Sequence, residues 1–291
     1  MFNSVKELVE TSERENLPVS EIMIRDEMER YGEEREQVWD RMAKNLDTMD
    51  AAVVKGSTDK GVFSQTGLTG GEAALLRDYR KNKVSLSGDV MMEAVQAAIA
   101  TNEVNASMGV ICATPTAGSS GTLPGVLAAL KRRLELPREG QIRFLFAAGA
   151  FGMVVANNAM IAGATGGCQA EVGSASAMGA AAAVEAAGGD ANMSAEAFAI
   201  AMSNLLGLVC DPVAGLVELP CVKRNAIGAG NALIAADIAL AGGTNKIPAD
   251  EVIVAMRQVG KNLPASLRET GIGGLAGTPT GEGFRRTIFG K

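Results

Sequence analysis

Only five charged side chains occur between residues 141 and 210, and this scarcity limits the possible folds more than any other feature of the sequence. Alanine and glycine supply much of this stretch. A segment so poor in charge must be buried, either inside the protein or in a bilayer. Helices rich in alanine and glycine can bring their backbones close together, which favours a tight core of many helices. The five charged residues are Arg143, Glu171, Glu185, Asp190 and Glu196.

A bilayer is the less favoured of these two environments. Residues 144–170 carry no charge and are long enough to span a membrane. However, they include Asn157, Asn158 and Gln169 and are interrupted by glycines, the mean hydropathy of the chain is +0.14, and no cluster of lysine and arginine flanks them. The N-terminal sequence MFNSVKELVE lacks the basic and apolar regions of a signal peptide. We therefore expect a cytoplasmic protein with no membrane insertion.

Apolar residues recur at helical spacing along almost the whole chain, which predicts an all-α protein. Two segments rich in glycine and serine, residues 55–71 and 112–121, are expected to be loops. The short apolar run at 108–111 could form a strand but has no partner to pair with. Helices are expected over residues 19–54, after Ser87, after Thr122, and over residues 141–161, 174–188, 194–209, 222–242 and 248–268.

Charge is distributed unevenly along the chain. The first 50 residues carry 14 acidic and 7 basic side chains, whereas the net charge of the whole chain is −6. We therefore divide the chain into a charged N-terminal helical segment, residues 1–55, and a helical domain, residues 56–291. The pI near 5.0 argues against a nucleic-acid partner held by a basic surface. The sequence has no histidine, which excludes a Ser-His-Asp triad, a histidine base and a zinc site with histidine ligands within this chain.

The four cysteines, Cys112, Cys168, Cys210 and Cys221, carry the strongest chemical signal. In a cytosolic chain we expect no disulfides, and free cysteines are often small buried apolar residues. Three of them, however, lie in turn-like sequences with glycine or proline: GATGGCQAE, LVCDPVAG and ELPCVKRNA. Backbone amides in such turns can stabilise thiolate charge at a metal or cluster site. The spacing C-x41-C-x10-C lacks a CxxC pair, which argues against a zinc ribbon or a ferredoxin.

Several long segments resemble the alpha chain of the bacterial iron–sulfur-dependent L-serine dehydratases. The resemblance covers residues 20–285 and includes LSGDVMMEAVQAAIATNEVNASMGVICATPTAGSSGTLPG, GATGGCQAEVGSASAMGAAA, NLLGLVCDPVAGLVELPCVKRNAIGA and SLRETGIGGLAGTPTG. It implies that residues 56–291 hold a [4Fe-4S] cluster through Cys168, Cys210 and Cys221. The fourth iron would lack a cysteine and face the substrate. Cys112 lies in a segment that resembles a pocket segment of the family, not a ligand segment.

The same resemblance implies a reaction and a partner. The expected reaction is the dehydration and deamination of L-serine to pyruvate and ammonia, without pyridoxal phosphate. Single-chain members of the family carry an SSSHT-type motif with a histidine near the substrate, and no such motif occurs here. The chain is therefore similar to the alpha half of the two-chain form, which works with a separate beta chain. Two other functions remain open: electron transfer by a closed cluster that would need Cys112, and a non-enzymatic helical scaffold.

Candidate substrate contacts are polar residues in or near the predicted loops, and the proton-abstracting base stays unassigned. The TAGSSGT loop runs into a helix start, where free N–H groups bind carboxylates, although a plain turn and helix cap explain it equally well. Lys223, Arg224 and Asn225 follow Cys221 and could neutralise a cluster or form an exposed helix start. The substrate candidates are Lys60, Thr114, Ser119, Ser120, Gly121 and Asn158. For Lys60 the alternative is a surface lysine, and for Asn158, with Asn157, it is a link between helices.

Overall fold

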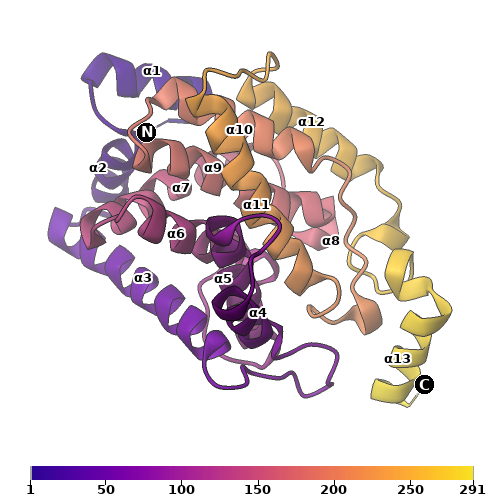
Figure 1. Ribbon diagram of the computed structural model, residues 1–291. Helices are drawn as coiled ribbons and strands as arrows, with labels where there is room; N and C mark the ends of the chain where they lie inside the picture. The colour runs from indigo at the N-terminus through magenta and orange to yellow at the C-terminus, as the bar shows by residue number, and fades with distance from the viewer. Residues whose placement is uncertain (1, 291) are drawn as a thin grey trace.

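The computed structural model describes residues 2–290 and is 71% helical, with thirteen α-helices and no strand in that range (Figure 1). The prediction of an all-α fold is confirmed. The helices are α1 (Val5–Glu15), α2 (Val19–Tyr31), α3 (Arg35–Ser57), α4 (Glu72–Asn82), α5 (Asp89–Ala106), α6 (Thr122–Arg133), α7 (Arg138–Asn158), α8 (Gly163–Gly166), α9 (Ser174–Ala186), α10 (Ala191–Asn204), α11 (Cys221–Leu240), α12 (Ala249–Asn262) and α13 (Pro279–Phe289).

The structure differs from the sequence prediction mainly at helix ends. The segment 19–54 is two helices, because Gly32 ends α2 in the left-handed conformation with φ of 64°. Helix α12 stops at Asn262, two residues before Pro264, and not at residue 268. Helices α1, α4, α8 and α13 were not predicted. A turn of π-helix, Gln169–Gly173, leads directly into α9.

Helix α9 is the centre of the core. All of its residues from Ser174 to Val184 are buried, and it packs against α6, α7, α10 and α11. The charge-poor stretch is therefore buried by other helices of the same chain. Within residues 2–290, no helix combines the length and apolar character that a bilayer crossing needs.

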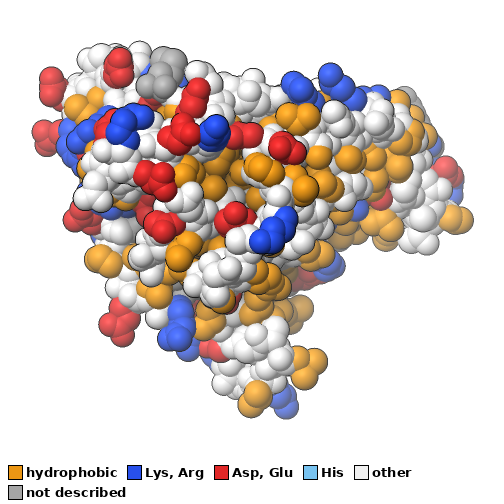
Figure 2. All heavy atoms as spheres, turned by 90° about the horizontal axis from the view of Figure 1, so that it is seen from above, with side chains coloured by type: hydrophobic (Ala, Val, Ile, Leu, Met, Phe, Trp, Pro, Cys, Tyr) orange, Lys and Arg blue, Asp and Glu red, His pale blue; other side chains and the backbone are white. Residues whose placement is uncertain are grey.

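The charged N-terminal helices cover one side of this core. Helix α2 packs against α7, and α3 packs against α5 and α7. Figure 2, seen from above Figure 1, shows acidic side chains gathered on the left, the side on which Figure 1 places α1 and α2. Many of these charges are paired within the segment, as in the ion pair between Arg35 and Glu21. The division at residue 55 stays a prediction.

Small residues let the helix backbones touch. A Cβ added to Gly56 of α3 would lie 2.3 Å from the carbonyl oxygen of Ala100 in α5. A Cβ added to Gly125 of α6 would lie 2.7 Å from the carbonyl oxygen of Ala94 in α5. Helices α3 and α6 thus each pack closely against α5 through a glycine. A larger residue at either position would force a backbone to move.

We expect Gly56→Ala to destabilise the fold by about 1–3 kcal/mol, because the new methyl group must push α3 away from α5. Gly149→Ala is the matched control, since Gly149 lies in α7 with nothing within 4 Å of an added Cβ. The control should be neutral or stabilising by up to about 1 kcal/mol, as expected for alanine in place of glycine in a helix. Thermal unfolding of the two variants measures the difference, and equal melting temperatures would contradict the close contact.

Candidate functional site

Three of the four cysteines converge in the interior. Cys168, Cys210 and Cys221 are 2%, 3% and 7% exposed, and all three are free thiols. Negative charge on Cys168 raises the pKa of both Cys210 and Cys221, so the three sulfurs lie within electrostatic reach of one another. The fold therefore brings together residues that are separated by up to 53 positions in the sequence.

Each cysteine is placed by the local structure that its turn sequence predicted. Gly167, with φ of +78°, allows the turn that places Cys168 at the start of the π-helical segment. The N–H of Cys210 donates to the carbonyl of Leu267 at 2.9 Å, which fixes the loop that carries this thiol. Cys221 is the first residue of α11, where the positive end of the helix dipole favours a thiolate.

Burial makes these thiols hard to ionise. It raises the pKa of Cys168 to about 12 and raises the pKa values of Cys210 and Cys221 further. Arg224 opposes the shift, because its guanidinium donates a hydrogen bond to Cys168 and lowers the pKa of Cys168 and Cys221. The same guanidinium is held by the carbonyl of Val209 and by Asp211, each at 2.7 Å. The site thus has one fixed cation beside three sulfurs.

The donor set of three free thiols suits a centre with thiolate ligands. Among residues 2–290, no three His, Cys, Asp or Glu side chains are arranged to hold one metal ion. Ligands of a four-iron cluster stand farther apart than ligands of one ion, and thiolates are the usual ligands of such clusters. Three buried free thiols that require positive charge to ionise match this chemistry.

Cys112 is not part of the thiol group. Its half-buried thiol donates to the backbone carbonyl of Asn45 at 3.5 Å. It lines a separate cavity of about 410 Å³ together with Met42, Met49 and Pro115. The prediction that this segment forms part of the substrate pocket stays a prediction.

The TAGSSG loop, residues 116–121, lies beside the thiols and is held by Asn225 of α11. Asn225 accepts from the N–H of Gly121 at 3.1 Å and donates to the carbonyls of Gly118 and Cys221 at 2.7 and 3.0 Å. The hydroxyl of Ser119 donates to the carbonyl of Thr114 at 2.8 Å, which closes the loop on itself. Of the predicted substrate contacts, Gly121 is therefore next to the start of α11, and Thr114, Ser119 and Ser120 belong to the same closed loop.

Ser120 is the residue of this loop whose environment most favours contact with a ligand. Its side chain is fully buried, and its hydroxyl oxygen has no hydrogen-bond partner in the described part of the chain. A buried hydroxyl without a partner is unfavourable, so such groups usually meet a water or a ligand.

Lys60 and Asn158 both lie on the surface of the protein. Lys60 is exposed in the loop between α3 and α4, which Thr66 fastens to Glu218 by hydrogen bonds of 2.8 and 2.9 Å. Asn158 is exposed at the end of α7, and its amide donates to the carbonyl of Asn3 at 2.8 Å. Asn157 and Asn158 are both exposed, because α7 leaves the core at this end. Their roles in substrate binding stay predictions.

Glu171, which was not predicted as a site residue, is a buried carboxylate that lies close to both the thiols and the TAGSSG loop. It lies three residues after Cys168 and accepts a hydrogen bond from the hydroxyl of Thr116 at 2.6 Å. Burial raises the pKa of Glu171, and the nearby Glu269 raises it further. One signal was available: Glu171 is the only charged residue between Arg143 and Glu185.

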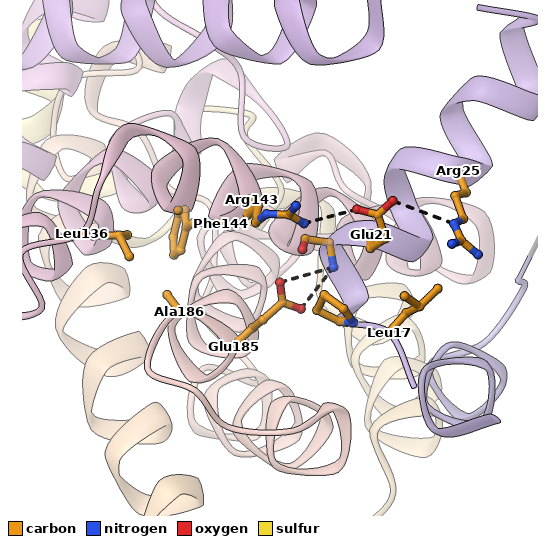
Figure 3. A pocket seen from close by; sticks show the side chains of 11 residues that line it. Leu17, Glu21, Arg25, Leu136, Arg143, Phe144, Glu185 and Ala186 are labelled. Carbon is orange, nitrogen blue, oxygen red and sulfur yellow. Dashed lines mark hydrogen bonds and ion pairs between the residues drawn. The ribbon is translucent and has the colours of Figure 1, made fainter. Parts of the chain in front are cut away.

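A second charged region lies at the junction of α2, α7 and α9 and contains no cysteine. Figure 3 shows this cavity, of about 490 Å³, with Glu21 between Arg25 and Arg143. Glu185 accepts from the backbone N–H of Ser20 at 3.1 Å and so caps the start of α2. These charges satisfy one another and join helices.

Glu103 anchors the end of the loop that carries Lys60. This buried carboxylate accepts from the backbone N–H of Glu72 at 2.7 Å and of Ala73 at 3.3 Å, at the start of α4. Burial raises the pKa of Glu103 from its ordinary value of 4.5 to about 7, despite these hydrogen bonds.

Glu103 should make the stability of the fold fall as the pH rises. Because its pKa is higher in the folded state, folding takes up a proton between about pH 4.5 and pH 7, and the free energy of unfolding decreases through this window by about 3 kcal/mol. Glu103→Gln keeps an acceptor oxygen but does not titrate. Between pH 5.5 and pH 8, the melting temperature should therefore fall less for the variant than for the wild type. Equal decreases in the two proteins would contradict the assignment.

The chain is similar to curated serine dehydratases along its whole length. The family described as serine dehydratase alpha chain matches residues 14–276. A probable L-serine dehydratase alpha chain of Bacillus subtilis is 60% identical over 290 residues, which cover 100% of this chain and 96% of the relative. The L-serine dehydratase alpha chain of Peptoniphilus asaccharolyticus is 42% identical over 99% of both chains. L-serine dehydratase 1 of Escherichia coli is 35% identical over 94% of this chain, but over only 61% of its own length.

Proposed function

The chain belongs to the serine dehydratase alpha chain family, and we propose that it converts L-serine to pyruvate and ammonia with a [4Fe-4S] cluster held by Cys168, Cys210 and Cys221. The observation that carries the cluster assignment is the convergence of these three free, buried thiols. The family supports the reaction, and the donor set supports the cofactor. We also propose a cytoplasmic location, because thiols of this kind persist in a reducing compartment.

Dehydration of serine requires the loss of the α-proton and of the β-hydroxyl group. Held by three cysteines, a [4Fe-4S] cluster would keep one iron free of protein ligands, and that iron would supply Lewis-acid chemistry for the loss of hydroxide. The first free product is an enamine, which becomes an imine and hydrolyses to pyruvate and ammonium. In this proposal no pyridoxal phosphate takes part.

The residues of the chain bind and orient the reactants. Arg224 stabilises thiolate charge beside Cys168. Ser120, with its unpartnered hydroxyl, and the backbone N–H groups at the start of α6 are suited to hold the substrate carboxylate. The thiols are almost fully shielded from water, which strengthens each of these electrostatic interactions.

A closed electron-transfer cluster is the main alternative. It would need a fourth protein ligand, and Cys112 is the only remaining cysteine. The thiol of Cys112 binds the carbonyl of Asn45, and no interaction with the other three thiols contributes to its pKa, which favours the open cluster. A helical scaffold without a cofactor would leave three buried thiols and Arg224 without a purpose.

We further propose that a beta chain completes the enzyme. The matched region spans about 60% of the single-chain relatives, so the remaining part of those proteins has no counterpart in this chain. The chain also has no histidine to serve in proton transfer. Three loops expose apolar side chains that a partner could cover: Phe63, Met108 and Ile272 are 60%, 83% and 67% exposed.

Replacing Cys168, Cys210 or Cys221 with alanine should abolish cluster assembly and activity, because no spare thiol is placed to substitute. Cys112→Ala is the matched control and should keep the cluster, since its thiol faces Asn45. Iron and sulfide analysis of the four variants, prepared without oxygen, is the measurement. Loss of iron in the Cys112 variant alone would overturn the ligand assignment.

The isolated chain should bind its cluster but turn over L-serine slowly or not at all, and adding the beta chain should restore pyruvate formation. The reason is that a partner supplies groups that this chain lacks. A pyruvate assay on the reconstituted chain, with and without the partner, makes the comparison. Equal rates in the two samples would mean that all catalytic groups lie within the 291 residues.

A further inference from the structure

We propose that Glu171 is a positioning residue, whose carboxylate clamps the TAGSSG loop to the segments that carry Cys168 and Cys210. The inference rests on the proposed function, because it assigns to this loop the task of presenting the substrate to the thiol site. Glu171 belongs to the π-helical turn that begins after Cys168, and it reaches the loop through the hydroxyl of Thr116.

The carboxylate is enclosed by three separate segments. A Cβ added to Gly163 would lie 2.7 Å from one carboxylate oxygen of Glu171 and 2.8 Å from the sulfur of Cys210. A Cβ added to Gly118 would lie 3.0 Å from the other oxygen. Two glycines thus make room for this side chain, one in the turn before Cys168 and one in the TAGSSG loop.

The neighbours of the Glu171 side chain are hydrogen-bond donors, so its position suits a group that only accepts hydrogen bonds. One oxygen accepts from the Thr116 hydroxyl at 2.6 Å, and the backbone N–H of Gly163 lies close enough to stabilise the charged carboxylate and lower its pKa. An amide in the same place would have to turn its NH2 group toward one of these two donors. The carboxylate is therefore matched to two donors on two different segments.

Glu171 and Asn225 attach the TAGSSG loop to two different segments of the site. Asn225 ties Gly118 and Gly121 to the start of α11, behind Cys221. Glu171 ties Thr116 to the segment of Cys168. The loop that contains Ser119 and Ser120 is thus fixed relative to the thiols at both of its ends. Loosening one end should weaken substrate binding more than it slows the chemical step.

The test compares Glu171→Gln, Thr116→Val and the double variant in the cluster-loaded enzyme with its beta chain. Each single change should raise the KM for L-serine by roughly 10- to 100-fold, as expected for the loss of a hydrogen bond to a charged group, with kcat changed by less than about 3-fold. The double variant should resemble the single variants, because both changes break the same contact. Thr116→Ser keeps the hydroxyl and should retain a KM near that of the wild type.

Glu185→Gln is the matched control. Glu185 is another carboxylate whose pKa is raised by burial, and it also accepts from a backbone N–H, but it caps α2. This control should leave the KM and the iron content unchanged. Hydrogen exchange of residues 114–121 gives a readout that does not depend on turnover, and it should be faster in the Glu171 and Thr116 variants only.

The outcomes separate the clamp from the proposed function. If the wild-type complex makes no pyruvate, the proposed function fails, while faster exchange of residues 114–121 in the variants still supports the clamp. A fall in kcat with an unchanged KM would overturn the positioning role, because Glu171 would then act in the chemical step. Unchanged exchange and unchanged KM would overturn it as well, as would loss of iron from both Glu171→Gln and Thr116→Val.

Discussion

Three sulfurs buried within reach of one another impose an electrostatic cost that the rest of the structure must offset. Each sulfur would carry a negative charge as a ligand, and negative charge on one raises the pKa of the others. The protein supplies Arg224, which contacts Cys168, and the N-terminus of α11 at Cys221. One guanidinium and one helix dipole do not balance three charges, so the site favours a bound group that is itself positive.

The helical core fixes the distances within this site. Cys168 leads through a π-helical turn into α9, and Cys221 begins α11, which packs against α9. Two of the three sulfurs therefore sit at the beginnings of two neighbouring core helices. Because α9 is buried throughout and closely packed by small residues, neither sulfur can move without moving the core. The scarcity of charge between residues 141 and 210 is thus a condition for holding the site rigidly.

The sequence predicted the components of the site better than their arrangement. Turn sequences around Cys168, Cys210 and Cys221 drew attention to these thiols, since glycine permits and proline fixes the backbone angles of turns, and the family resemblance implied that they are ligands. Periodicity does not tell where a helix leaves the core, so the exposure of Asn158 at the end of α7 could not be predicted. Helices α1, α4, α8 and α13 were missed because they are short: α8 has four residues and the other three have 11 each. The convergence of the thiols depends on the packing of α9 and α11, which no local pattern contains.

Glu171 illustrates why a lone charge in an apolar stretch deserves a structural explanation. A buried carboxylate lowers stability unless its oxygens are satisfied, and here Thr116 and Gly163 satisfy them. Both donors belong to segments that must stay in place if the TAGSSG loop is to face the thiols. A side chain held by two donors is suited to fixing its neighbours and poorly suited to moving toward a proton on the substrate. Under the proposed function, this leaves proton transfer to another group, which agrees with an enzyme completed by a second chain.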